Sequence, residues 1–260
     1  MRIALTIEYN GAKYFGWQKQ KINKSKTIQY HVDRAIATIA DEPIATICAG
    51  RTDTGVHALS QVVHFDTTKK RKDYKWIQGI NSFLPADIII KEIYHVDDSF
   101  HARYLAIDRT YRYIILNQKH PSSHMLETVY HFDQKINISK IRSTFKYFKH
   151  EKDYSCFRSS GCSAKNPIKH IKSIKITKQN NLIYIDITAN SFLYHMVRNI
   201  VGALLDVGVE KKSSDSIKKI IDSSDRKLCG KMVPASGLYL MSVSYPKKYK
   251  IFSTQEFNIL

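Results

Sequence analysis

Apolar and polar residues alternate along several short segments of the chain, and this period of two is typical of β-strands. Four segments of the first half have this pattern: residues 2–9, 44–49, 59–66 and 87–96. Two segments between them place apolar residues three and four apart, which predicts helices. One helix is expected from Thr27, as its N-cap, to about Ala40, and the other near 73–83, ending before Pro85.

The second half begins again with a long strand pattern at 105–117. Residues 171–189 contain two alternating runs on either side of Gln179, Asn180 and Asn181, which predicts a β-hairpin. Helices are expected at three further segments, 138–149, 194–208 and 213–222. A final strand is expected at 237–245.

Strands and helices are mixed without strict alternation, which indicates an α+β protein. Each half resembles a βαββαβ order, so we expect two ferredoxin-like halves. Together they would form a mixed, mostly antiparallel sheet with helices packed on it and a cleft between the halves. The predicted boundaries are 1–104 for the N-terminal half, 105–247 for the C-terminal half and 248–260 for a C-terminal tail.

Charge adds a prediction about partners. The 260 residues include 41 Lys and Arg against 23 Asp and Glu, a net charge of +18. Such an excess attracts polyanions such as RNA, DNA or anionic membranes. Drift of the composition toward lysine in loops explains the charge equally well, so charge alone leaves both interpretations open.

Other classes of site receive little support from the sequence. The four cysteines form no C-x-x-C pair, the histidines lack metal-binding spacing, and no Walker A or G-x-G-x-x-G loop is present. The N-terminus does not resemble a signal peptide, and no run reaches the roughly 18 apolar residues of a membrane span. We therefore expect reduced thiols and a cytoplasmic location, and the residues suggest neither a zinc ribbon nor a nucleotide cofactor.

The stretch CAGRTDTGVHA, residues 48–58, is unusual for a connection between two strands. It holds Asp53 close to Arg51 and between two glycines. Residues two apart in an extended segment point the same way, so Arg51 could help to keep the Asp53 carboxylate ionised. An aspartate that only bonds its own turn is the commoner case.

Arg198 lies in the most apolar predicted helix of the chain. A buried unpaired charge costs several kcal/mol, so this arginine must reach water or find an anion. Asp206 is about 12 Å further along the helix, too far for an easy ion pair. Asp53 would serve as a partner, although a position on the exposed edge of the helix remains an alternative.

Aromatic and basic residues occur together in several predicted strands and loops. Tyr111, in the run RTYRY, could stack on a base, although a strand tyrosine is more often structural. The loops 18–26 and 67–73 are basic, and the first follows Tyr14, Phe15 and Trp17. That mixture suits phosphate contact and base stacking, but charged loops are usually only solvated.

Six motifs, in this order, resemble those of the tRNA pseudouridine synthase A family. They are YNGAKYFGWQKQ, AGRTDTGVHALSQVVHF, FHARYLAIDRTYRYIILN, FRSSGCSAKNPIK, FLYHMVRNIVGALLDVG and PASGLYLMSVSYP. The resemblance extends from Tyr9 to about Pro246, nearly the whole chain. It implies an isomerase that converts uridine to pseudouridine at positions 38, 39 and 40 of the tRNA anticodon stem-loop.

The resemblance also implies roles for particular residues. Asp53 matches the catalytic aspartate of the family, and Arg198 the arginine paired with it. Tyr111 matches an active-site tyrosine, Leu238 an apolar residue of the uracil pocket, and Arg51 an arginine that helps to displace the target base. The family implies a homodimer that binds tRNA and needs no metal or organic cofactor.

Two other classes of function remain as alternatives. A non-catalytic RNA-binding or chaperone protein with the same folded cleft would need neither Asp53 nor Arg198. A base-flipping glycosylase would also use a carboxylate, but it would release free uracil, which an isomerase does not.

Overall fold

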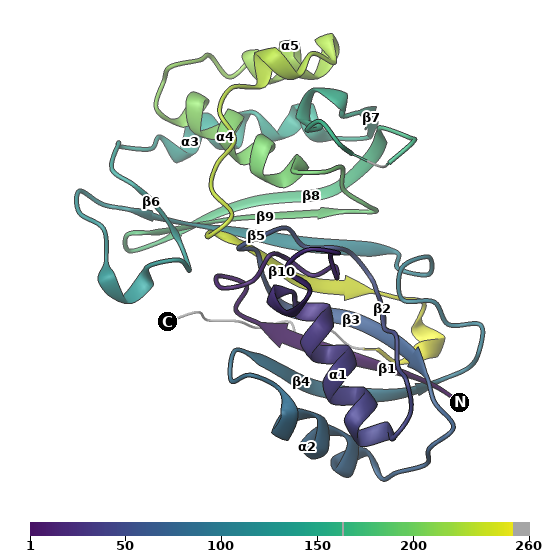
Figure 1. Cartoon of the computed structure of the whole chain (residues 1–260). Coiled ribbons are helices and arrows are strands. Elements are labelled where there is room, and N and C mark those ends of the chain that lie inside the picture. Colours follow the sequence, from purple (N-terminus) through teal and green to yellow (C-terminus); the bar gives the residue numbers. More distant parts are fainter. Residues whose placement is uncertain (163, 252–260) are drawn as a thin grey trace. The chain divides into compact units, whose positions relative to one another are not determined.

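The computed structural model describes residues 1–162 and 164–251, which form two compact units (Figure 1). Of the described residues, the first unit comprises 1–109 and 239–251, and the second comprises those of Thr110–Leu238. The sequence had grouped the last strand with the second half. The structure places all but the first residue of this strand, β10 (Leu238–Ser244), in the first unit, where it pairs in parallel with β3 (His57–Asp66).

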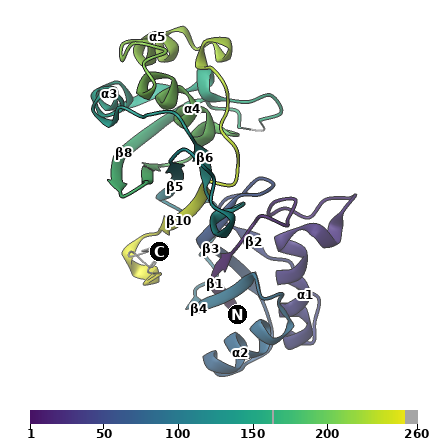
Figure 2. The same ribbon diagram turned by 90° about the vertical axis from the view of Figure 1, so that its left-hand side faces the viewer.

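The first unit follows the predicted βαββαβ order. Its elements are β1 (Arg2–Tyr9), α1 (Ile28–Ala40), β2 (Ile47–Cys48), β3, α2 (Asp73–Phe83) and β4 (Ile88–Val96). Within this unit the strands lie in the order β4-β1-β3-β10, and β2 also pairs with β3. The strands β1, β3 and β4 pair antiparallel, with Ile3 opposite Phe65 and Ala4 opposite His64. Helices α1 and α2 pack together on one face of this sheet (Figure 2).

Both faces of the first sheet are covered, which explains why β1 and β3 are buried almost throughout. Phe65 points toward the helices, where its ring meets that of Trp76. Its neighbour His64 points to the opposite face and packs edge-on against Phe100. Phe100 in turn contacts the rings of Tyr245 and Tyr249, so the end of the described chain closes this second face.

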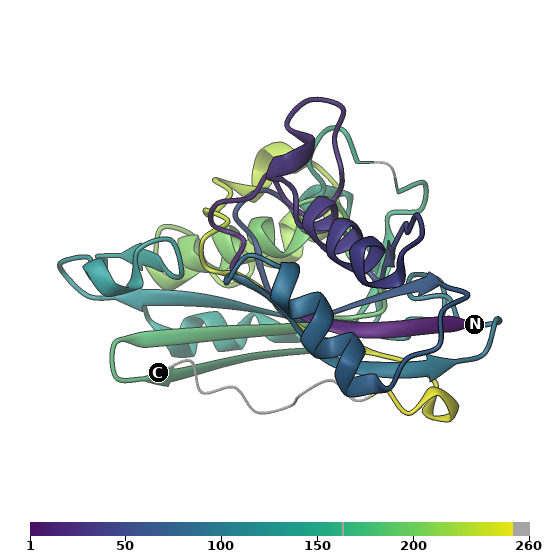
Figure 3. The ribbon, with the colours of Figure 1, turned by 60° about the horizontal axis from the view of Figure 1, so that its bottom comes forward.

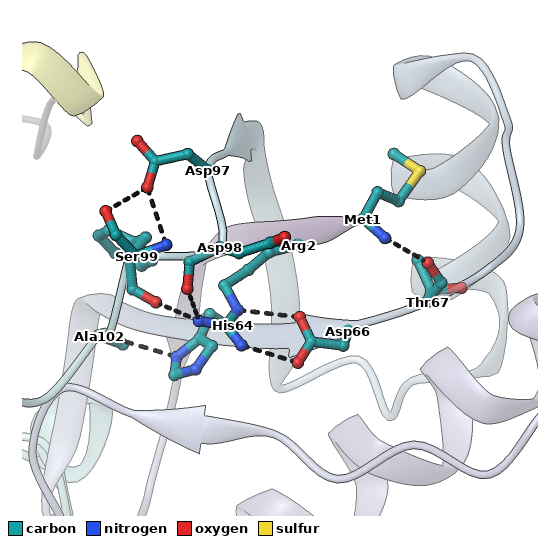
Figure 4. Close-up of polar contacts among 10 residues, drawn as sticks. Met1, Arg2, His64, Asp66, Thr67, Asp97, Asp98, Ser99 and Ala102 are labelled. Carbon is teal, nitrogen blue, oxygen red and sulfur yellow. Dashed lines mark hydrogen bonds and ion pairs between the residues drawn. The ribbon is translucent and has the colours of Figure 1, made fainter.

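Arg2 fixes the segment that includes Phe100 (Figure 4). Its guanidinium donates two hydrogen bonds to the Asp66 carboxylate, at 2.9 and 2.8 Å, and two more to the carbonyl oxygens of Asp98 and Phe100. The two backbone carbonyls are thereby paired within the protein. The connection after β4 is thus held against the sheet.

Within the second unit the strands lie in the order β5-β9-β8-β7, and β6 pairs with β5. These strands are β5 (Asp108–Asn117), β6 (Tyr130–Phe132), β7 (Glu151–Asp153), β8 (Ile168–Gln179) and β9 (Leu182–Ala189). The predicted hairpin is confirmed, because β8 and β9 pair antiparallel out to Gln179 and Leu182 (Figure 3).

Three helices belong to the second unit: α3 (Ile138–Ser143), α4 (Met196–Gly208) and α5 (Ser216–Ser223). Eleven residues of α4 are buried, so this helix forms the centre of the unit's core. It packs against α3, where Gly208 leaves room for Ile136 and Ile141. The predicted α+β class, with a mostly antiparallel arrangement of strands and packed helices, is confirmed.

Three predicted elements differ in detail. The strand expected at 44–49 is only Ile47–Cys48, because the buried Asp33 carboxylate accepts the backbone N–H of Thr46 in place of a neighbouring strand. The helix expected at 138–149 ends at Ser143 and continues as a 3₁₀ turn. There the Thr144 hydroxyl bonds back to the Ile141 carbonyl at 2.7 Å, which competes with the regular helix. Thr27 precedes α1 as expected, but its hydroxyl donates to the carbonyl of Lys24 instead of capping the helix.

The predicted tail, 248–260, falls within the described residues only as far as Ile251. Residues 247–249 form a short 3₁₀ turn there. Among the helices of the described residues, none has the length and apolar character that crossing a bilayer requires.

Candidate active site

The loop that carries Asp53 joins β2 to β3, and its first residues are fixed from several sides. The N–H of Ala49 donates to the carbonyl of Val62 on β3. The buried side chain of Gln61 donates to the carbonyl of Gly50 at 2.6 Å. A guanidinium N–H of Arg109 donates to the carbonyl of Ala49 at 3.0 Å. The loop therefore leaves the sheet in a defined direction.

The segment after β1 runs beside the Asp53 loop and holds its centre. The backbone N–H of Trp17 donates to the carbonyl of Thr52 at 3.0 Å, and the N–H of Gly55 donates to the carbonyl of Tyr14 at 3.3 Å. The hydroxyls of Tyr9 and Thr52 form a buried hydrogen bond at 2.7 Å. Thr52, the residue before Asp53, and Gly55, two residues after it, are thus both hydrogen-bonded to the segment that follows β1.

Two glycines make this close approach possible. A Cβ added to Gly11 would lie 1.9 Å from the carbonyl oxygen of Val56. A Cβ added to Gly16 would lie 2.5 Å from the carbonyl oxygen of Thr52 and 3.0 Å from the carbonyl carbon of Asp53. Gly16 also has φ of +80°, a conformation that side chains disfavour. Glycine is therefore required in the segment that supports the loop, and in the loop itself Gly55 also has a positive φ, of +76°.

The Asp53 side chain is half-buried, between the buried residues Thr52 and Val56. A turn closes directly after it, because the N–H of Val56 donates to the Asp53 carbonyl at 3.1 Å. Arg51 is exposed on the same loop. The arrangement places an accessible carboxylate on a rigid support, which is what a catalytic acid, base or nucleophile needs.

In the second unit, Tyr111 lies on β5 and is half-buried. Its ring packs edge-on against Phe192, with ring centroids 5.1 Å apart and an angle of 86° between the rings. The ring is therefore held in place by Phe192. It is neither a freely moving surface side chain nor a fully buried core residue.

Arg198 is half-buried near the start of α4, in the apolar surroundings that the sequence indicated. Its Nε donates to the carbonyl of Val233 at 2.8 Å. Burial lowers the pKa of the adjacent His195 to about 4, and the charges of Arg198 and Arg226 lower it further in the same direction. His195 is thus neutral at pH 7, which leaves Arg198 as a cation beside an uncharged ring.

The segment 233–238 contacts α4 at Arg198 and β5 at Tyr113, and it ends at Leu238. Arg198 bonds to its first residue, Val233. The hydroxyl of Tyr113, two residues beyond Tyr111, donates to the carbonyl of Pro234 at 2.7 Å. The segment ends at Leu238, which is 5% exposed and whose N–H donates to the carbonyl of Ala235. The structure thus brings β5, α4 and Leu238 to one short segment.

Asp53 and Arg51 belong to the first unit, whereas Tyr111, Arg198 and Leu238 belong to the second. Each group is well defined within its own unit. The pairing of the Asp53 carboxylate with the Arg198 guanidinium, and the cleft that would contain it, stay predictions.

The supporting residues Tyr9, Thr52, His57 and Gln61 were not predicted from the sequence. His57 accepts the N–H of Gly11 through Nδ1 at 3.2 Å and stacks on Tyr239 with ring centroids 4.5 Å apart. Two of these residues could have been noticed in the sequence, because His57 and Gln61 are polar residues in a strand that is buried on both faces. Buried polar groups need hydrogen-bond partners, so such positions point to a neighbouring loop or segment.

Within residues 1–162 and 164–251, no three His, Cys, Asp or Glu side chains gather closely enough to hold a metal ion. The predicted site residues of the two units can supply a carboxylate, a guanidinium and a phenol for chemistry.

Comparison with known proteins identifies similar sequences. A family model described as tRNA pseudouridine synthase matches residues 5–105 and 145–246. A tRNA pseudouridine synthase A from Buchnera aphidicola of Schizaphis graminum is 45% identical over 96% of this chain and 94% of its own length. Proteins of the same name from Vibrio campbellii and Escherichia coli are 41% and 40% identical, each over 96% of this chain and over 94% and 92% of their own lengths.

Proposed function

Because the chain belongs to the tRNA pseudouridine synthase family, we propose that it converts uridine to pseudouridine at positions 38, 39 and 40 in the anticodon stem-loop of tRNAs. Pseudouridine formation rearranges a nucleoside without adding or removing atoms, so the protein is an isomerase. The net charge of +18 suits a polyanionic substrate of this kind.

The observation that carries the proposal is the half-buried carboxylate of Asp53 on a loop held by Tyr9, Tyr14 and Trp17. The reaction cuts the bond between C1′ of the ribose and N1 of uracil, rotates the base, and joins C1′ to C5. Cleavage leaves positive charge on the sugar, which an adjacent carboxylate stabilises, as in glycosidases. Attack on C1′, attack on C6 of the base and removal of a sugar proton all begin from this carboxylate.

The other predicted residues have supporting roles in this proposal. Arg198 keeps Asp53 ionised and oriented, since a nearby cation favours the charged form of a carboxylate. Tyr111 stacks on the uracil and assists loss of the C5 proton, while Leu238 contributes an apolar wall to the uracil pocket. The target base must first leave its stack, which costs a few kcal/mol, and Arg51 takes part in that displacement.

We further propose that the protein acts in the cytoplasm as a homodimer, without metal or organic cofactor. The family resemblance supports the dimer. The chemistry itself supports a cofactor-free reaction, because isomerisation needs neither a redox partner nor a group donor.

The test measures release of tritium from an anticodon stem-loop RNA labelled at uracil C5. Isomerisation expels the C5 hydrogen to water, and binding alone does not. We expect release by the wild type and none by Asp53→Asn, with RNA binding kept in both. Asp41→Asn is the matched control, because the Asp41 side chain is 90% exposed at the end of α1 and asparagine tolerates its φ of +51°.

Three other results would contradict the proposal. Tight binding without tritium release would indicate a non-catalytic RNA-binding protein. Free uracil in the products would indicate a glycosylase. Release that persists in Asp53→Asn would place the chemistry at another residue.

A further inference from the structure

Of the three aromatic residues in the segment Tyr14–Trp17, only Phe15 presents its ring to solvent. Trp17 is fully buried. Tyr14 is 7% exposed, and its hydroxyl donates to the carboxylate of Asp87 at 2.5 Å. Phe15 is 39% exposed, although its neighbours on both sides are packed. The sequence suggested base stacking by this segment as a whole, and the structure restricts that role to one ring.

The backbone of Phe15 is fixed on both sides. Its N–H donates to the carbonyl of Lys26 at 2.8 Å, and its carbonyl accepts from the side-chain amide of Gln20 at 3.0 Å. A side chain on a backbone that is already fixed leaves only its own rotation to be restricted when a ligand stacks on it. Phe15 therefore has the rigidity of a binding platform as well as the exposure.

Phe15 also lies next to the Asp53 loop. The carbonyl of Tyr14, the residue before it, accepts the N–H of Gly55. Gly16, the residue after it, approaches so closely that an added Cβ would lie 3.0 Å from the carbonyl carbon of Asp53. An RNA strand whose target nucleotide is at Asp53 thus has a neighbouring nucleotide near the Phe15 ring.

The surroundings of the ring favour an anionic ligand. Residues 11–32 contain five lysines and no aspartate or glutamate. One of these lysines, Lys26, has its ammonium group 5.7 Å from the centroid of the Phe15 ring. An aromatic ring beside cations is the combination that binds single-stranded nucleic acid, with the base on the ring and the phosphate on the cation.

We propose that Phe15 is a stacking platform for the base of an unpaired nucleotide that adjoins the target uridine, with Lys26 contacting a nearby phosphate. The inference rests on the proposed function and adds a second nucleotide to the substrate that the site recognises. It assigns to Phe15 a role in binding RNA, separate from the chemical step at Asp53.

The first experiment measures the Kd of a fluorescently labelled anticodon stem-loop RNA for Phe15 variants. We expect Phe15→Ala to weaken binding by roughly 5- to 100-fold, because base stacking on an aromatic ring has about that effect on affinity. Phe15→Trp should bind like the wild type, and Phe15→Leu, which is apolar but cannot stack, should bind like the alanine variant. Phe83→Ala is the control, since Phe83 is 57% exposed on α2 of the same unit.

The second experiment removes the base from the RNA instead. Stem-loops that lack the base on the 5′ side or the 3′ side of the target uridine are compared with the intact RNA. We expect Phe15→Ala to have no further effect on one of these two RNAs. A full effect on both, equal binding by Phe15→Ala and Phe83→Ala, or wild-type binding by Phe15→Leu would each overturn the proposal.

The two proposals can fail separately. Loss of affinity in Phe15→Ala with no tritium release from any stem-loop would leave Phe15 as an RNA-binding residue and reject the isomerase. Normal affinity in Phe15→Ala, together with tritium release that depends on Asp53, would reject the stacking platform and keep the isomerase.

Discussion

Lowering the pH from 7 to 4 should destabilise the protein through His64, a buried histidine of β3. Its side chain is 3% exposed, and its Nδ1 accepts the backbone N–H of Ala102 at 3.2 Å (Figure 4). Burial lowers the pKa of His64 to about 4, and the positive charges of Arg2 and His101 act in the same direction. The folded protein therefore holds this ring neutral where an unfolded chain would protonate it.

The size of the effect follows from the two pKa values. The difference between the ordinary value of 6.5 and about 4 corresponds to roughly 3 kcal/mol of unfolding free energy. Because the pKa of this cationic group is lowered by folding, the stabilisation is complete above pH 6.5. It is lost as the pH falls from 6.5 to 4, where the unfolded chain binds a proton that the folded protein does not.

The assay is urea unfolding of the wild type and of His64→Gln at pH values between 7 and 4. Groups that do not interact with His64 titrate equally in both proteins, so the difference between the two pH profiles reports on His64 and on His101, whose ring lies 4.9 Å from it. We expect the wild type to lose roughly 3 kcal/mol more than the variant over this range. Parallel profiles, or an NMR titration of His64 with a midpoint near 6.5, would refute the reasoning.

Two further predictions concern the support of the Asp53 loop. Tyr9→Phe removes the hydrogen bond to Thr52, so the rate of tritium release in a single turnover should fall by roughly 3- to 10-fold. The affinity for RNA should not change. An unchanged rate would show that this bond does not position Asp53. Gly16→Ala should lower the free energy of unfolding by at least about 1 kcal/mol more than Gly161→Ala, measured in urea. Both glycines have positive φ, but only Gly16 has backbone atoms in the way, so equal losses would mean that the contact with Thr52 is unimportant.

The sequence was sufficient for elements whose burial follows a regular period. The strand 2–9, the helix 73–83 and the hairpin around Asn180 were predicted closely, because their local pattern matches their packing. The strands β6 and β7 have three residues each, too few to show a period. Their pairing depends on neighbours that are distant in the sequence.

In the candidate site, too, local sequence predicts some residues, whereas contacts between distant segments determine others. Asp53 and Arg51 are prominent in their own loop, so local sequence and the family motifs were enough to select them. The hydroxyl of Tyr9 reaches Thr52 across 43 residues of sequence, and no local pattern indicates such a contact. The carbonyl partner of Arg198 was also missed, because any residue can supply a carbonyl and residue types therefore do not reveal it.

The discontinuity of the first unit has a consequence for synthesis of the protein. The second unit is one continuous stretch, Thr110–Leu238, and all of it has been made before β10 is complete. The first unit still lacks β10 at that point, together with Tyr245 and Tyr249, which cover Phe100. As the chain leaves the ribosome, the unit with Arg198 can therefore finish folding before the unit with Asp53, although the Asp53 loop is translated first.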